Sequence, residues 1–184
     1  IDVAAGDDHT VYVKSDGSMW AMGYNSYGQF GDGGSSSSTT PVQVYASGVA
    51  DVEAGYRHTL ILMTDGSLWA TGYNNYGQLG DGSGSTRYTP VEVFSSGVSQ
   101  IAAGYYHSMI VTDSGGLWAT GNNGNGELGD GTGSTRYTPV SIYTSGAVSV
   151  AAGYGHTLIE RTDGRFYATG DNGYGQLGDG TTSD

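Results

Sequence analysis

The stretch from Gly55 to Gly82 reads GYRHTLILMTDGSLWATGYNNYGQLGDG, and it is one copy of a unit that fills the whole chain. Its first glycine, its histidine and its last aspartate recur at a constant spacing of 49 residues, with no insertion or deletion between copies. The 184 residues therefore contain about 3.75 copies, which cover 1–49, 50–98, 99–147 and 148–184. A period of about 40 to 50 residues is typical of β-propellers and related repeat arrays.

Each copy predicts four short β-strands and no helix. The first is short and apolar, as in Ile101–Gly104, and the second, as in Thr59–Thr64, is apolar at nearly every position, which suits a strand covered on both faces. A two-residue turn at Asp65–Gly66 leads to the third strand, Leu68–Gly72. The segment Thr89–Val93, opened by a proline, fits an outermost edge strand. We therefore predict an all-β array of four-stranded propeller blades, in which the last copy lacks its outer strand.

Composition excludes several classes of function. The chain has 6 Lys and Arg against 18 Asp and Glu, a net charge of −12, which disfavours nucleic acid and anionic membrane surfaces as partners. Without cysteine there is no disulfide, thiolate metal site or cysteine nucleophile. No apolar run approaches the roughly 18 residues of a membrane-spanning helix, so no membrane insertion is expected. The abundance of Gly, Ser, Thr and Tyr with little Lys favours an extracellular or cell-surface location.

The repeat resembles that of the regulator of chromosome condensation family. The resemblance is carried by Gly55–Thr59, Asp65–Asn74 and Gly77–Gly82, and the same pattern recurs over essentially the whole chain. It implies a β-propeller, usually of seven blades, which fewer than four copies cannot complete. The family's nuclear guanine-nucleotide exchange factors insert a β-wedge into a GTPase from one lengthened repeat, and equal intervals leave no room for such a wedge.

The positions that stay constant between copies are interpreted as structural, because a catalytic residue is seldom needed in every blade. Each histidine is expected to hydrogen-bond the backbone around its own G-x-x-H turn. The alternative is a set of imidazoles around the propeller axis that binds a metal, as in a metal-dependent lyase or hydrolase. The residues assigned to this structural repeat are His9, His58, His107, His156, Trp20, Trp69, Trp118, Asp32, Asp81, Asp130 and Asp179.

The Gly-Asp-Gly triplets, such as Gly80–Gly82, are predicted to be turns in which the carboxylate caps backbone N–H groups. Calcium stays open as an alternative ligand, although neither the EF-hand spacing nor the calcium-binding nonapeptide is present. The sequence contains no nucleophile elbow, no separated pair of acids typical of a glycosidase and no phosphate loop followed by a helix. We therefore predict a non-enzymatic protein without a metal or an organic cofactor.

Two loops differ between copies, and both are predicted to emerge on one face. They are the two middle residues of the G-x-x-H turn and the loop after the third strand. Tyrosine in rigid loops makes an effective recognition surface, because it brings contact area at low entropy cost. The candidate binding residues are Asp7, Asp8, Tyr56, Arg57, Tyr105, Tyr106, Tyr154, Tyr27, Tyr76 and Tyr174.

The predicted function is a binding or assembly scaffold that presents these loops to a protein or a glycan. The alternatives are a guanine-nucleotide exchange factor for a small GTPase and the metal-dependent enzyme. An open array would expose apolar blade faces, so we also expect further copies in a longer chain or self-association to complete a ring.

Overall fold

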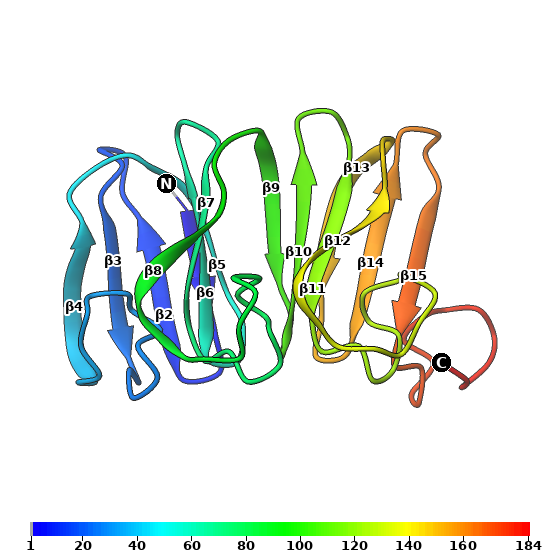
Figure 1. Ribbon diagram of the computed structural model, residues 1–184, viewed down its shortest axis with the longest axis horizontal. Coiled ribbons are helices and arrows are strands. Elements are labelled where there is room, and N and C mark those ends of the chain that lie inside the picture. The colour runs from blue at the N-terminus through cyan, green and yellow to red at the C-terminus, as the bar shows by residue number, and fades with distance from the viewer. Residues whose placement is uncertain (1) are drawn as a thin grey trace.

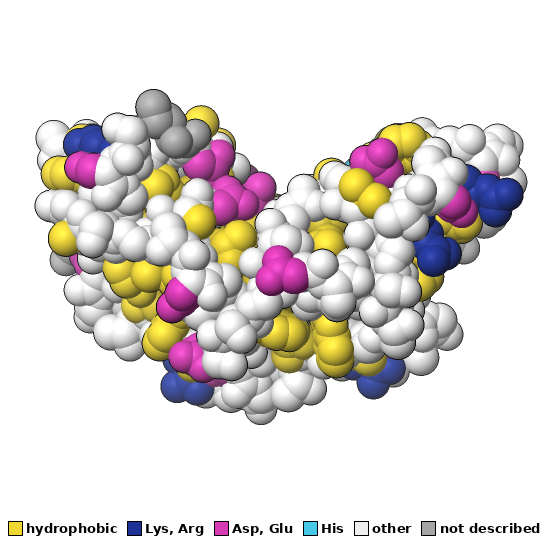
Figure 2. All heavy atoms as spheres, turned by 90° about the horizontal axis from the view of Figure 1, so that it is seen from above, with side chains coloured by type: hydrophobic (Ala, Val, Ile, Leu, Met, Phe, Trp, Pro, Cys, Tyr) yellow, Lys and Arg dark blue, Asp and Glu magenta, His cyan; other side chains and the backbone are white. Residues whose placement is uncertain are grey.

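The computed structural model describes residues 2–184 and shows an open arc of four antiparallel sheets (Figure 1). The first three sheets have four strands and the last has three, each in sequence order, so the predicted propeller blades are confirmed. Seen from above, the arc is a crescent with one hollow side (Figure 2). The described residues include no helix that could cross a membrane. The strands are β1 Asp2–Ala5, β2 His9–Val13, β3 Met19–Gly23, β4 Ser38–Tyr45, β5 Val49–Ala54, β6 His58–Met63, β7 Leu68–Gly72, β8 Arg87–Phe94, β9 Val98–Ala103, β10 His107–Thr112, β11 Leu117–Gly121, β12 Arg136–Tyr143, β13 Ala147–Ala152, β14 His156–Arg161 and β15 Phe166–Gly170.

The hairpin between the second and third strand of a blade differs from the predicted two-residue turn. In the first blade Lys14 N donates to Ser18 O at 2.9 Å and Gly17 N donates to Lys14 O at 2.9 Å, so the loop holds three residues. Gly17 has φ of 75°, and no residue other than glycine has a positive φ among those described. A two-residue type I′ turn would need Asp16 to adopt a positive φ as well, whereas a three-residue loop needs only the glycine.

The proline of the outer strand lies inside the strand and does not open it. β8 begins three residues before Pro90, and its register against β7 shifts between Ala70 and Gly72. The missing N–H of Pro90 therefore falls where the ladder is already interrupted, on a strand with only one neighbour in its sheet.

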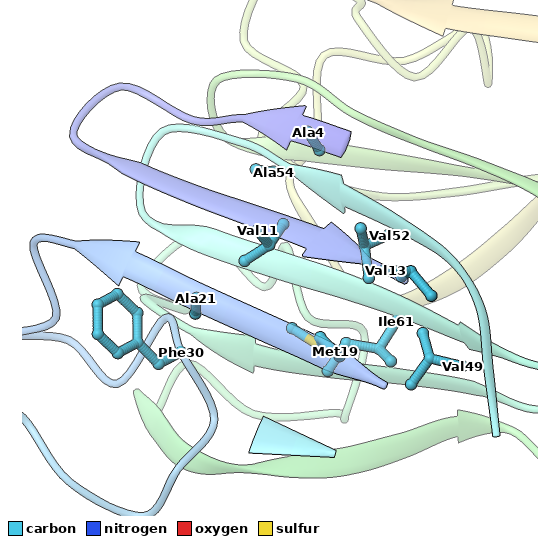
Figure 3. Packing of buried hydrophobic residues seen from close by; sticks show 10 residues of the cluster. All are labelled: Ala4, Val11, Val13, Met19, Ala21, Phe30, Val49, Val52, Ala54 and Ile61. Carbon is cyan, nitrogen blue, oxygen red and sulfur yellow. The ribbon is translucent and has the colours of Figure 1, made fainter. Parts of the chain in front are cut away.

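The core lies between blades rather than within one blade. Figure 3 shows Val11 and Met19 of the first blade in one cluster with Val52 and Ile61 of the second, and all four side chains are buried. Because a blade is a single sheet, it can bury its apolar residues only against its neighbours. The central strands β6 and β10 are buried at five of their six positions, as predicted for strands covered on both faces.

The tryptophans of the third strands brace this packing. Trp69 packs against the first core cluster and donates from Nε1 to Ser67 Oγ at 3.1 Å. Trp20 makes the same bond to Ser18 at 3.0 Å. Trp118 meets Phe94 of the preceding blade edge-on, with ring centroids 5.9 Å apart.

The last blade exposes the face that the other blades bury. Leu60 is 1% exposed and its equivalent Leu158 is 42% exposed, while Leu68 is fully buried and its equivalent Phe166 is 73% exposed. The outer face of β14 and β15 is therefore an unoccupied blade interface among the residues described.

These equivalent leucines give a matched test. Leu60→Ala removes a side chain from a packed blade interface and should lower the free energy of unfolding by about 3 kcal/mol. Leu158→Ala makes the same chemical change on the open face and should lower it by less than about 1 kcal/mol. Urea unfolding of both variants measures the difference. Equal losses would instead show that a second copy covers the outer face in solution, which light scattering of the wild type would reveal.

Candidate recognition face

The G-x-x-H turns depend on a close contact between glycine and histidine. In the third blade Gly104 N donates to His107 O at 2.8 Å, and the imidazole of His107 lies directly over the glycine. A Cβ at Gly104 would overlap the ring, and the same holds for the other three turns. Only glycine therefore allows the histidine side chain to fold back over its own turn.

The rings of His9, His58 and His107 each bond a side chain of the next blade, which corrects the expected bond to their own turns. His58 Nε2 lies 3.1 Å from Ser108 Oγ, and the Ser108 hydroxyl donates to the carbonyl of Gln78 at 2.8 Å. Because the hydroxyl proton is used on that carbonyl, the imidazole must donate, which fixes the Nε2–H tautomer. We call this chain of three groups the interblade relay. It recurs from His9 to Thr59 (3.0 Å) and Gln29 O (2.6 Å), and from His107 to Thr157 (3.0 Å) and Glu127 O (2.8 Å).

Burial keeps the relay histidines neutral. Loss of solvation lowers the pKa of His9 to about 4, that of His58 to about 3 and that of His107 to about 4. The neighbouring histidines lower the pKa of His58 further. A protonated ring would also leave a charge without water inside the blade interface.

The lowered pKa values predict a loss of stability in mild acid. The unfolded chain takes up protons on its histidines near pH 6.5 and the folded chain does not, so their contribution is complete above pH 6.5 and is lost as the pH falls toward about 4. His107→Gln should reduce the difference in unfolding free energy between pH 7 and pH 5 by about 2 kcal/mol. Urea unfolding of wild type and variant at both pH values checks this, and an unchanged difference would contradict a neutral buried His107.

A buried asparagine, which the sequence analysis missed, organises the loop after the third strand. Asn74 is fully buried, and its amide donates to Asp81 Oδ1 at 2.9 Å and to Ser83 O at 3.0 Å. Its oxygen accepts Leu79 N at 3.0 Å. Asp81 also caps Ser83 N at 3.0 Å and pairs with Arg87 at 2.6 Å. The sequence did contain a signal for this role, because an asparagine recurs at this position every 49 residues. The equivalent residues Asn25, Asn123 and Asn172 make the same bonds.

The Asp side chains of the Gly-Asp-Gly triplets are thus engaged with their own loops. Asp32, Asp130 and Asp179 each accept a backbone N–H two residues further on, at 3.0, 2.9 and 2.8 Å. Residues 2–184 contain no group of three or more His, Asp or Glu side chains arranged to hold a metal ion.

Most of the tyrosines predicted as binding residues form one connected surface. They belong to turns and loops that lie at the lower edge of the blades in Figure 1. Tyr105 lies between Tyr56 and Tyr154, with ring centroids 4.1 Å from each. Tyr106 joins this row to Tyr76, whose centroid is 4.6 Å away. We call the set the tyrosine face. Its members are Tyr24, Tyr27, Tyr56, Tyr73, Tyr76, Tyr105, Tyr106 and Tyr154.

Arg57 anchors one end of the tyrosine face. Its guanidinium lies 4.4 Å from the ring centroid of Tyr56 and 4.9 Å from that of Tyr27, and Nη1 donates to Tyr27 Oη at 3.1 Å. Asp7 and Asp8 are exposed in the first turn, where Asp7 lines the same hollow as Tyr56 and Asp8 lines another with Tyr24. Tyr174 is 97% exposed on the last blade without a described ring contact.

The family follows from this repeat. The family model of the RCC1-like domain matches residues 1–184. The chain belongs to the RCC1-like domain family. A comparison with curated proteins finds no match.

Solved structures agree with this assignment. Human WBSCR16 has 25% sequence identity and a TM-score of 0.85, with 100% of this chain and 52% of that chain covered. Prp20, the RCC1 of the yeast Saccharomyces cerevisiae, has 24% identity and a TM-score of 0.86, with 99% and 48% covered, and its complex with Kap60 has 23% identity and the same TM-score, with 99% and 46% covered. The RCC1-like chain described here thus spans about half the length of these chains. All strands described in it belong to blades, so residues 2–184 form no additional β-wedge.

The RCC1-like arc also carries an acidic cluster on its first strands. Asp51 and Glu53 on β5 lie near Asp2 on β1, and Figure 2 shows acidic side chains gathered on one wall of the hollow side. Burial, with repulsion from Asp2, raises the pKa of Asp51 and of Glu53 to about 7. The comparison of repeats in the sequence missed this cluster, because the acidic residues are not repeated in the later blades.

The raised pKa of Asp51 predicts the opposite pH response from the histidines. Its folded pKa lies above its unfolded value, so its protonated form supports the fold at low pH and this support is lost as the pH rises through about 7. Asp51→Asn mimics the protonated form and can still donate to Asp2. The stability advantage of the variant over wild type should be larger at pH 8 than at pH 5 by about 2 kcal/mol, because the unfolded wild type has lost this proton at both pH values and the folded wild type loses it between them. Thermal unfolding of both proteins at the two pH values measures this difference. An advantage of the variant that does not grow between pH 5 and pH 8 would contradict the raised pKa of Asp51.

Proposed function

We propose that this RCC1-like chain is a non-enzymatic scaffold that binds a protein through the tyrosine face. The observation that carries the proposal is the contact between the rings: eight tyrosines from adjacent loops touch one another in a continuous surface at one edge of the arc. Tyrosine and arginine are enriched where protein interfaces derive most of their binding energy.

The surface is already ordered before any partner arrives. Each loop is held by a buried asparagine, and the first three G-x-x-H turns are held by their histidines and the next blade. The rings also restrain one another through contacts of 4.1 to 6.4 Å between centroids. A partner therefore meets rings whose entropy has already been lost on folding, which favours tight binding for a given area.

The relatives support a protein as the class of partner. One yeast RCC1 structure is a complex with Kap60, and the other is described with binding properties to Gsp1p and histones. For this chain we propose only the same class of partner, a protein, because its similarity to these structures shows the fold alone. The net charge of −12 favours a partner that is basic where it meets the face.

The test is selection of peptides from a random display library against the folded chain. Enriched peptides should bind the wild type with a Kd in the micromolar range and should bind Tyr56→Ala/Arg57→Ala at least tenfold more weakly, because this change removes two contact side chains from the face. Fluorescence anisotropy of labelled peptides measures both affinities.

Tyr88→Ala is the matched control, because Tyr88 is a half-exposed tyrosine on the outer strand β8 and lies outside the tyrosine face. It should bind the peptides as the wild type does. Selection of peptides that ignore Tyr56 and Arg57 would overturn the proposal, and so would binding of a glycan array in place of any peptide.

A further inference from the structure

The loop of one blade and the G-x-x-H turn of the next enclose a space that we call an interblade slot. The same repeat position fills the first two slots with different side chains. In the first slot Arg57 packs against Tyr27, and in the second Tyr106 packs against Tyr76. In the third slot the equivalent residue is Gly155, which has no side chain to place there.

The third slot is consequently an open pocket of about 220 Å³. This volume is below the roughly 300–1,000 Å³ of sites for drug-sized molecules, and it suits a single side chain. Tyrosines wall it, and amide and carboxylate groups line its base. The lining residues are Tyr76, Tyr105, Tyr106, Tyr154, Asn122, Asn125, Glu127 and Gly155.

The third slot has gained a negative charge where it has lost a side chain. Glu127 replaces the glutamines Gln29 and Gln78 of the first two copies, and it is only 2% exposed. Its two oxygens accept Asn122 Nδ2 at 2.7 Å and Asn125 N at 2.9 Å. Neither donor carries a charge, and no cation pairs with Glu127 among residues 2–184. A buried carboxylate of this kind is stabilised by a cation. Each of its oxygens keeps a free lone pair that can accept a hydrogen bond from a cationic group.

We propose that the third interblade slot binds the guanidinium group of an arginine side chain from the protein partner. The chain itself supplies the precedent, because Arg57 occupies the first slot against three tyrosines. In the third slot Tyr106 and Tyr154 supply aromatic walls for a cation, and Glu127 adds a carboxylate, which the first slot lacks. This inference rests on the proposed function and names the side chain that the face selects.

The test uses N-acetyl-L-arginine amide as the probe and N-acetyl-L-citrulline amide as its uncharged isostere. Titration of the isotopically labelled chain, followed by NMR, should show saturable shifts at the backbone amides of Asn125 and Gly155 with the arginine probe. Citrulline should bind at least tenfold more weakly, because it lacks the charge that pairs with Glu127.

Two variants locate the binding in the slot. Glu127→Gln restores the residue of the other copies and should weaken arginine binding at least tenfold. Gly155→Arg should abolish it by placing a guanidinium in the slot, as Arg57 does in the first one. A Cβ at Gly155 meets Asp171 Cβ at 3.4 Å and Asn125 Nδ2 at 3.6 Å, which is ordinary contact, so this variant should fold.

Ser145→Arg is the control for charge, because it adds the same group at an exposed turn at the opposite end of β13. It should leave arginine binding unchanged. Equal binding of citrulline, or full binding to Glu127→Gln and Gly155→Arg, would overturn the inference. Failure of the probe while selected peptides still bind through Tyr56 would remove the arginine site alone, whereas probe binding without any peptide would remove the proposed scaffold function and leave the pocket standing.

Discussion

The hydrogen-bond relay from a histidine to the hydroxyl of the next blade determines how neighbouring sheets stack. It is short, fully buried and directional, and it joins two strands and one loop at each blade boundary. The glycine of the turn is required because the imidazole covers it, and the loop carbonyl is held because the hydroxyl donates to it. The aliphatic core then fills the space between sheets whose separation the relay has set. The tyrosine face is ordered by the same contacts, because its rings project from these turns and loops.

The fold class, the number of blades and the order of their strands followed from the period of 49 residues. The partner of His58 could not be read from its own turn, because it lies 50 residues away. A signal was nevertheless present: each histidine is followed by Ser or Thr, and successive residues of a strand point to opposite faces. The histidine therefore reaches one neighbouring blade, and the hydroxyl beside it reaches the other.

Within the candidate site, the type of residue predicted which side chains lie on the surface better than the variability of the loops did. Tyrosines in the variable turns were identified as surface residues, and the structure places most of them in one connected face. The loop after the third strand was treated as variable throughout, although Asn74 and its equivalents are constant and buried. The pocket in the third interblade slot depends on Gly155, and the absence of a side chain acquires meaning only when the walls around it are known.

The direction of the relay makes the two ends of the arc chemically different. Among the residues described, the hydroxyl of Thr10 on the first blade receives no histidine, and the imidazole of His156 on the last blade reaches no hydroxyl. One end thus carries a vacant acceptor and the other a vacant donor, which match each other and not themselves. Any association that prolongs the relay from one chain to another must therefore be head to tail, with the last blade of one chain against the first blade of the next. Such contacts close into a ring when the rotation per chain divides a full turn, and they continue as a helical filament when it does not.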